Sequence, residues 1–225
     1  DERGEFISPD LMIALMGHFF MEGIGTSPAA RERQALKAAG HTAGVKALQD
    51  IRSSKAVGEY LAPMGVQMYT WRVGRAYAAP RLRGIDGLFG GELAGHYYFK
   101  DFFYSDSGIM ASLIVLDIVA EFKRRGRSLS QLIAGISKYC NSGEINFRVA
   151  DKPAAMEAVR EHFTSMETPA AVMDFDGYRV EFPDWWFNIR PSNTEPYLRF
   201  ICEASSPELL ADKVAQARSV ISRFE

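Results

Sequence analysis

The segment WWFNIRPSNTEPYLRFI occupies residues 185–201. Both of its ends are rich in aromatic and aliphatic residues, which favour β-strands. Its centre, residues 190–196, contains proline, serine, asparagine and threonine, which are typical of turns. We therefore predict two β-strands joined by a tight polar loop. The simplest interpretation of this loop is a hairpin that only turns the chain.

The same loop carries the groups that a phosphate needs. Arg190 has a guanidinium that can bind two oxygens at once, Ser192 and Thr194 have hydroxyls, and Asn193 has an amide. Backbone N–H groups released by a turn add further donors. Phosphate binding is therefore a second interpretation of residues 190–194.

A second polar motif, GELAGH, lies at residues 91–96 and follows a short strand-like segment. A carboxylate such as Glu92 can accept hydrogen bonds from two neighbouring hydroxyls of a sugar. The flanking glycines predict a backbone that can approach a ligand closely while Glu92 and His96 face it. The same pattern also fits a pair of metal ligands, or a turn that holds a hydrogen-bonded histidine.

Strand and helix patterns alternate ahead of this motif, which is typical of a layered α/β domain. The predicted elements are a helix from Pro9, a buried strand at 47–51, a helix at 55–62, a strand at 66–73 and a long helix at 109–123. The apolar positions of that long helix predict burial over a wide face. Residues 23–47 show no sustained apolar stripe, so we expect an exposed or mobile connection there.

Arg52 follows the predicted strand at 47–51, at the end where open α/β sheets place ligand-binding residues. It is a candidate for contact with a substrate or a phosphoryl group. The alternative is that this segment only starts the next helix, with Ser53 or Ser54 as its N-cap.

The order of elements changes after Asn141-Ser142-Gly143, which we take as a domain boundary. A helix, four or five strands and a final helix beginning at Ser206-Pro207 follow. This pattern predicts a small antiparallel sheet covered by two helices, of the TATA-box-binding-protein-like kind. We therefore expect an α/β domain over 1–140 and an α+β domain over 141–225.

Composition limits the possible functions. The formal net charge of -2 and the pI near 6.2 give no basic footprint, which argues against nucleic acid and anionic membranes as partners. The apolar run Ile109–Val119 is too short to span a bilayer. Cys140 and Cys202 lie far apart and predict reduced thiols rather than a disulfide framework. Together these features predict a cytoplasmic protein.

The two motifs, in this order, resemble those of the α-D-phosphohexomutases, the family of phosphomannomutases and phosphoglucomutases. The segment RPSNTEP resembles their phosphate-binding loop, and GE-x-x-GH resembles the sugar-specificity loop of their third domain. The resemblance implies that the chain comprises the third and fourth domains. It implies sugar contacts from Glu92, Ala94 and His96, and an assisting cation at Arg52. The implied phosphate ligands are Arg190, Ser192, Asn193 and Thr194.

Members of this family interconvert hexose 1-phosphates and hexose 6-phosphates through a phosphoserine and a glucose or mannose 1,6-bisphosphate intermediate. Their phosphoserine and Mg²⁺ ligands lie in the two earlier domains, and the motifs that carry them are not found in this sequence. The resemblance therefore implies the C-terminal half of such an enzyme, inactive alone, whose partners are a hexose phosphate and the missing N-terminal domains. Asn193, where phosphoglucosamine mutases usually have glycine, favours a mannose or glucose phosphate.

Three positions depart from the family pattern. Arg75 stands in place of a histidine, Ala79 in place of a lysine, and Ala94 in place of a serine. Arginine stays protonated, so Arg75 can replace a charge but not a proton carrier. These departures support an alternative function, a non-catalytic phosphosugar-binding or regulatory module that is derived from the enzyme.

Overall fold

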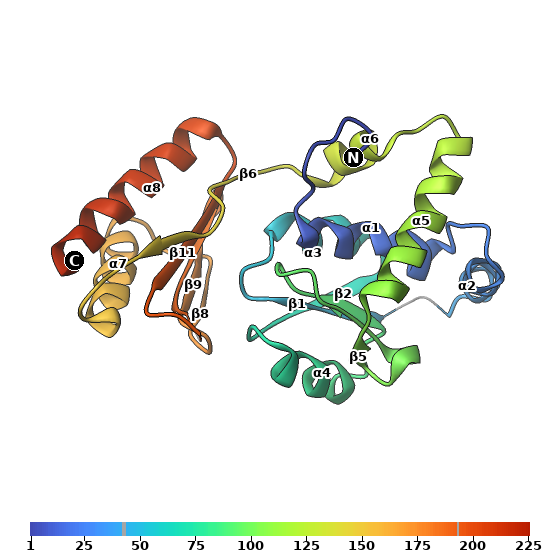
Figure 1. Ribbon diagram of the computed structural model, residues 1–225, viewed down its shortest axis with the longest axis horizontal. Coiled ribbons are helices and arrows are strands. Elements are labelled where there is room, and N and C mark those ends of the chain that lie inside the picture. The colour runs from blue at the N-terminus through green and yellow to red at the C-terminus, as the bar shows by residue number, and fades with distance from the viewer. Residues whose placement is uncertain (42–43, 193) are drawn as a thin grey trace. The chain divides into compact units, whose positions relative to one another are not determined.

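The computed structural model describes residues 1–41, 44–192 and 194–225. Its contacts divide the chain into a first unit, Asp1–Lys138, and a second unit, Tyr139–Glu225 (Figure 1). No helix among the described residues is long and apolar enough to cross a membrane. Cys140 and Cys202 form no disulfide, and burial raises the pKa of the Cys202 thiol to about 12.

A five-stranded mixed sheet organises the first unit. Its strand order is β2-β1-β3-β4-β5; the first three strands are parallel, and β4 and β5 are antiparallel additions. The strand bounds are β1 Val45–Asp50, β2 Val66–Trp71, β3 Phe89–Gly91, β4 Tyr97–Phe99 and β5 Ser105–Asp106. This arrangement confirms the predicted layered α/β fold, and it brings the ends of β1 and β2 close to the loop that follows β3.

Helices lie on both faces of this sheet. Those on one face are α1 (Pro9–Glu22), α3 (Lys55–Leu61), α5 (Gly108–Arg124) and α6 (Leu129–Ile136), while α4 (Arg75–Gly84) covers the other (Figure 1). The central helix α1 is apolar on almost every side, and Phe20 stacks on Phe89 of β3 with ring centroids 4.6 Å apart. Such all-round apolarity is typical of a helix buried between other elements.

Two helices were not predicted. Helix α2 (Pro28–Ala38) lies within the segment that we expected to be a connection, and its sole buried residue is Ala30. It forms without an apolar stripe because Ser27 caps it, Pro28 occupies its first turn, and its other residues have high helix propensity. Helix α4 contains Pro80 in its interior, which the sequence would suggest as a break.

The wide burial predicted for α5 was wrong. Its buried residues form one stripe of Ala111, Ile114, Ile118 and Phe122. Leu113, one of the apolar positions of this helix, has 64% of its surface exposed. The helix covers the sheet from one side, so only residues spaced by three or four positions reach the core.

The second unit is built on an antiparallel sheet with strand order β6-β11-β10-β9-β8, and β7 also pairs with β11. The strands are β6 Cys140–Asn141, β7 Ile145–Phe147, β8 Ala171–Met173, β9 Tyr178–Glu181, β10 Trp185–Pro191 and β11 Leu198–Ala204. Helices α7 (Lys152–Met166) and α8 (Pro207–Ile221) pack on the sheet through a core that contains Val159, Phe187 and Phe200. The predicted α+β fold with two helices is confirmed.

Alternation along β10 decides which side chains face the helices. Trp185, Phe187 and Ile189 belong to the core under α7 and α8. Because successive side chains of a strand point to opposite faces, Asn188 and Arg190 lie on the other face of the sheet. The predicted hairpin between β10 and β11 is confirmed, with Pro191 paired to Leu198.

Candidate functional site

Asp50 links the segment at the end of β1 to the motif at residues 91–96. It is the last residue of β1 and is buried. Its carboxylate accepts from the backbone N–H and from Nη2 of Arg52, both at 2.7 Å, and from the backbone N–H of Leu93 at 2.9 Å. Sequence reasoning missed Asp50, because Leu93 lies 43 positions further along the chain.

Arg52 is buried with its guanidinium against Asp50. The ion pair fixes this cation at the carboxyl end of β1. Its contact with a ligand stays a prediction. The alternative interpretation, an N-cap for the next helix, is confirmed at Ser54, whose Oγ accepts from the N–H of Ala56 at 3.0 Å at the start of α3.

Glu92 is buried, and both of its carboxylate oxygens have partners within the first unit. Oε1 accepts from the Tyr98 hydroxyl at 2.6 Å, and Oε2 accepts from the backbone N–H of Gly74 at 3.2 Å. Burial raises the pKa of Glu92, and the hydrogen bond from Tyr98 partly offsets this effect. A carboxylate has about four acceptor positions, so these bonds orient Glu92 and still leave it able to accept from a sugar.

The glycines before Glu92 serve the fold. A Cβ on Gly90 would lie 2.6 Å from the carbonyl oxygen of Leu48, and one on Gly91 would lie 2.9 Å from Cγ1 of Ile13. Both residues are buried between neighbouring elements. They allow β3 to pack against β1 and α1. A role for the glycines of this motif in letting a ligand approach stays a prediction.

His96 and Ala94 are the exposed residues of the motif. The Nδ1 atom of His96 lies 2.7 Å from Oδ2 of Asp106, whose other oxygen lies 3.5 Å from Nε of Arg75. Asp106 thus links Arg75, one of the three residues that depart from the family pattern, to the histidine of the motif. Ala94 brings no polar group to this surface.

In the second unit, Arg190 lies at the end of β10 and has 2% of its surface exposed. Its Nε donates to Oδ1 of Asp176 at 3.3 Å. Its Nη2 is buried and has no hydrogen-bond partner in the part of the chain that the structure describes. A buried donor without an acceptor costs free energy, so it is a strong candidate for contact with a ligand.

The loop after Arg190 is tied together by Ser192. Its Oγ lies 3.4 Å from the N–H of Thr194 and 3.2 Å from that of Glu195, and its own N–H donates to the carbonyl of Tyr197 at 2.9 Å. Its hydroxyl hydrogen can still donate to an anion, and Thr194 is exposed. Asn193, the remaining predicted phosphate ligand, lies outside the described residues.

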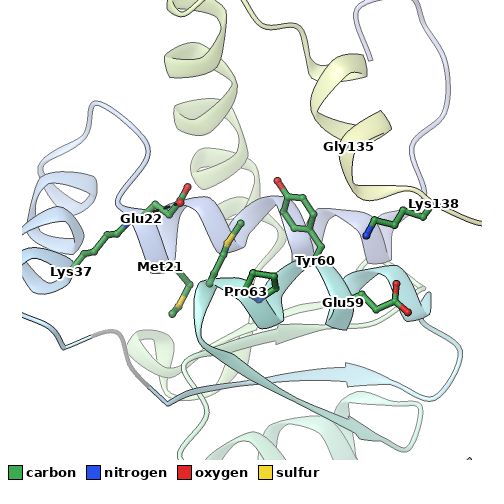
Figure 2. Close-up of a pocket in the computed structure, with 9 residues that line it drawn as sticks. Met21, Glu22, Lys37, Glu59, Tyr60, Pro63, Gly135 and Lys138 are labelled. Atoms are coloured by element: carbon green, nitrogen blue, oxygen red, sulfur yellow. Dashed lines mark ion pairs between the residues drawn. The ribbon is translucent and has the colours of Figure 1, made fainter. Parts of the chain in front are cut away.

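A cavity of about 590 Å³ lies between α1, α3 and α6 of the first unit (Figure 2). Tyr60 and Glu22 line it, and none of the predicted site residues does. Behind it, His18 is buried and bonded to both, through Nδ1 to Glu22 at 2.7 Å and through Nε2 to Tyr60 at 2.8 Å. These bonds give the buried His18 side chain two polar partners at the edge of the core.

No group of three or more His, Cys, Asp or Glu side chains that could hold a metal ion occurs among the described residues. The magnesium that the resemblance implies therefore finds no ligand set in that part of the chain.

Sequence models of two consecutive domains of one family match the chain. Residues 29–139 match the α/β/α domain III of phosphoglucomutase/phosphomannomutase, and residues 144–219 match the C-terminal domain of the same family. The chain belongs to the phosphoglucomutase/phosphomannomutase family. The phosphomannomutase of Methanocaldococcus jannaschii is 32% identical over 225 residues, which are 100% of this chain and 44% of that protein.

Other family members agree with this assignment. The phosphomannomutase of Salmonella typhimurium is 33% identical over 91% of this chain and 40% of its own length. A crystal structure of a phosphoglucomutase/phosphomannomutase family protein from Burkholderia thailandensis superposes with a TM-score of 0.73 at 23% identity, over 99% of this chain and 44% of that one. The chain thus spans about two fifths of the length of its curated relatives.

A more distant structure shows the same fold with a ligand. The Aspergillus fumigatus N-acetylphosphoglucosamine mutase, a variant in complex with glucose 1,6-bisphosphate, superposes with a TM-score of 0.67 at 13% identity, over 98% of this chain and 44% of that one.

Proposed function

We propose that this chain supplies the sugar- and phosphate-binding domains of a phosphohexomutase that interconverts hexose 1-phosphates and hexose 6-phosphates. The observation that carries the proposal is Arg190. It is buried in the loop RPSNTEP, and its Nη2 has no partner among the described residues. A phosphate oxygen is the acceptor that would best satisfy this donor, because charge-assisted bonds from arginine to phosphate are strong.

We assign the phosphate to residues 141–225 and the sugar to residues 1–140. Arg190, Ser192, Asn193 and Thr194 would hold the phosphate that does not react, while Glu92 accepts from sugar hydroxyls and His96 contacts the same sugar. Phosphoryl transfer depends on holding the reacting groups in place and on stabilising charge, so binding residues of this kind contribute directly to the rate.

The reacting groups are proposed to lie elsewhere in the whole protein. A phosphoserine would donate its phosphoryl group to the hexose phosphate, giving a 1,6-bisphosphate, and would then take back the other one. Magnesium would be bound next to that serine and would stabilise the transferring charge. Neither group is assigned to a residue of this chain, and Arg52 is proposed only as an assisting cation.

Titration calorimetry tests the binding half of this proposal. The chain is expected to bind mannose 1-phosphate and glucose 1-phosphate, and to bind free mannose and free glucose far more weakly. No heat of binding with either hexose phosphate would overturn the assignment.

A mutase assay tests the reaction. The 225-residue chain alone is expected to show no turnover, and a full-length protein that contains it is expected to convert hexose 1-phosphate. Binding by the chain without turnover by the full-length protein would favour a non-catalytic phosphosugar-binding module, which the departures at Arg75, Ala79 and Ala94 already suggest.

A further inference from the structure

The turn between β8 and β9, residues 174–177, lies directly against the end of β10. Antiparallel pairing places Tyr178 opposite Ile189, so the residues just before Tyr178 meet the part of β10 that carries Arg190. Asp176 and Gly177 of this turn both lie against Arg190.

Gly177 lets the turn approach the main chain of Arg190. Its φ is +67°, a backbone conformation that residues other than glycine rarely adopt. A Cβ at this position would lie 2.2 Å from the carbonyl oxygen of Ile189 and 2.6 Å from Cβ of Arg190. The backbones of the turn and of β10 are therefore in direct contact, with no space for a methyl group.

Asp176 holds the guanidinium of Arg190. Its carboxylate oxygen Oδ1 accepts from Nε of Arg190 at 3.3 Å, and the two side chains have 9% and 2% of their surface exposed. A guanidinium has five N–H donors in a rigid plane, so holding Nε fixes the direction of the others. Nη2 stays without a partner among the described residues, although it is on the same guanidinium.

We propose that Asp176 is a positioning residue for phosphate binding, which directs Nη2 of Arg190 toward the phosphate. Gly177 allows the turn that carries Asp176 to pack directly against β10. This inference rests on the proposed function, because it assumes that Arg190 binds the phosphate. Asp176 itself carries a negative charge and does not touch the anion.

Because Asp176 is negatively charged, the inference can be tested by whether neutralising it strengthens or weakens the binding of an anion. By electrostatics alone, Asp176→Asn removes a negative charge close to the site and strengthens the binding of an anion. Under the positioning role, the same change replaces a charge-assisted bond to Nε by a weaker neutral one, so the guanidinium is held less firmly and binding weakens by roughly 3- to 10-fold. The two explanations therefore predict opposite directions.

The experiment is titration of the whole chain with mannose 1-phosphate, in the wild type, Asp176→Asn, Asp174→Asn and Arg190→Ala. Asp174 is the matched control, because it is an exposed aspartate of the same turn for which no contact with Arg190 is found. We expect Asp176→Asn to weaken binding, and Asp174→Asn to leave affinity within about twofold, because the charge it removes is exposed and screened. In the Arg190→Ala background, Asp176→Asn is expected to cause no further weakening, because the guanidinium that it positions is gone and only the removal of a negative charge remains.

The outcomes separate the two proposals. If the wild type binds and Arg190→Ala weakens binding, but Asp176→Asn leaves it unchanged or tightens it, the positioning role is wrong and the proposed function stands. An equal effect of Asp176→Asn with and without Arg190 also contradicts the positioning role. A wild-type chain that does not bind mannose 1-phosphate overturns the proposed function, and this inference with it.

Discussion

Glu92 and Arg190 are both buried charged residues in polar loops at strand ends, but their hydrogen-bonding groups are used differently. Each oxygen of Glu92 already accepts a bond, from Tyr98 and from Gly74. Arg190 is held at Nε by Asp176, and its Nη2 is left without an acceptor among the described residues. Without a ligand, both oxygens of Glu92 therefore already have a hydrogen bond, whereas Arg190 has a buried donor that lacks an acceptor among the described residues.

This difference suggests how the two loops divide their work. A ligand that supplies an acceptor to Arg190 removes the cost of a buried unsatisfied donor, so the phosphate should provide most of the affinity. Glu92 gains less from a sugar hydroxyl, because its charge is already partly compensated. Its fixed orientation should instead decide which sugar is accepted.

The largest effect on stability is expected from Gly177→Ala, which disturbs the loop that has the unsatisfied donor. The added methyl group overlaps the carbonyl of Ile189 and strains a positive φ, so we expect a loss of roughly 2–4 kcal/mol in the unfolding free energy. Gly143→Ala is the control, because Gly143 has φ +66° and open space around it. Denaturant unfolding followed by tryptophan fluorescence, from Trp185 and Trp186 in this unit, measures both. Equal losses would show that the contact with β10 contributes nothing.

A smaller effect is expected from Tyr98→Phe in the other loop. Loss of its hydroxyl removes the 2.6 Å bond to buried Glu92, and we expect about 1–3 kcal/mol less stability in the first unit. Tyr104→Phe is the control, because the Tyr104 hydroxyl donates to an exposed aspartate, Asp86. Circular dichroism during denaturant unfolding compares the two. A Tyr98→Phe chain as stable as Tyr104→Phe would mean that Glu92 does not depend on this bond.

The pH dependence of stability is expected to be the smallest effect. Burial, partly offset by the Tyr98 hydrogen bond, raises the pKa of Glu92 above its ordinary value of 4.5. The folded chain therefore holds this proton to higher pH than the unfolded chain does. The contribution of Glu92 to stability should fall as the pH rises from about 4.5 through the folded pKa. Unfolding measured across this range should show the decline in the wild type and less of it in Glu92→Gln; identical profiles would contradict the raised pKa.

Local signals predicted much of the fold. The aromatic strands on either side of residues 190–196 gave the hairpin, and serine–proline pairs such as Ser206-Pro207 gave helix starts that the structure confirms. The same signal at Ser27-Pro28 marks the start of α2, but no helix was predicted there because the segment has no apolar stripe. On α5, composition could not show that Leu113 faces outward, because burial depends on what the helix packs against.

The partners of the candidate site residues could not be predicted in the same way. Asp50 reaches Leu93, and Asp176 reaches Arg190, only after the sheets have formed. Aspartate is common at strand ends and in turns, so neither residue stands out in the sequence. The sequence thus indicated candidate groups for contact with a ligand, and the structure adds the residues that form hydrogen bonds to those candidates.

The division of work between the loops is tested most directly by titrating three proteins, wild type, Arg190→Ala and Glu92→Gln, with inorganic phosphate and with mannose 1-phosphate. Arg190→Ala should weaken both ligands by a similar factor, roughly 30- to 150-fold for a lost charge-assisted bond of about 2–3 kcal/mol. Glu92→Gln should weaken mannose 1-phosphate alone and leave phosphate binding unchanged. A Glu92→Gln chain that loses as much affinity for phosphate as for mannose 1-phosphate would contradict the account.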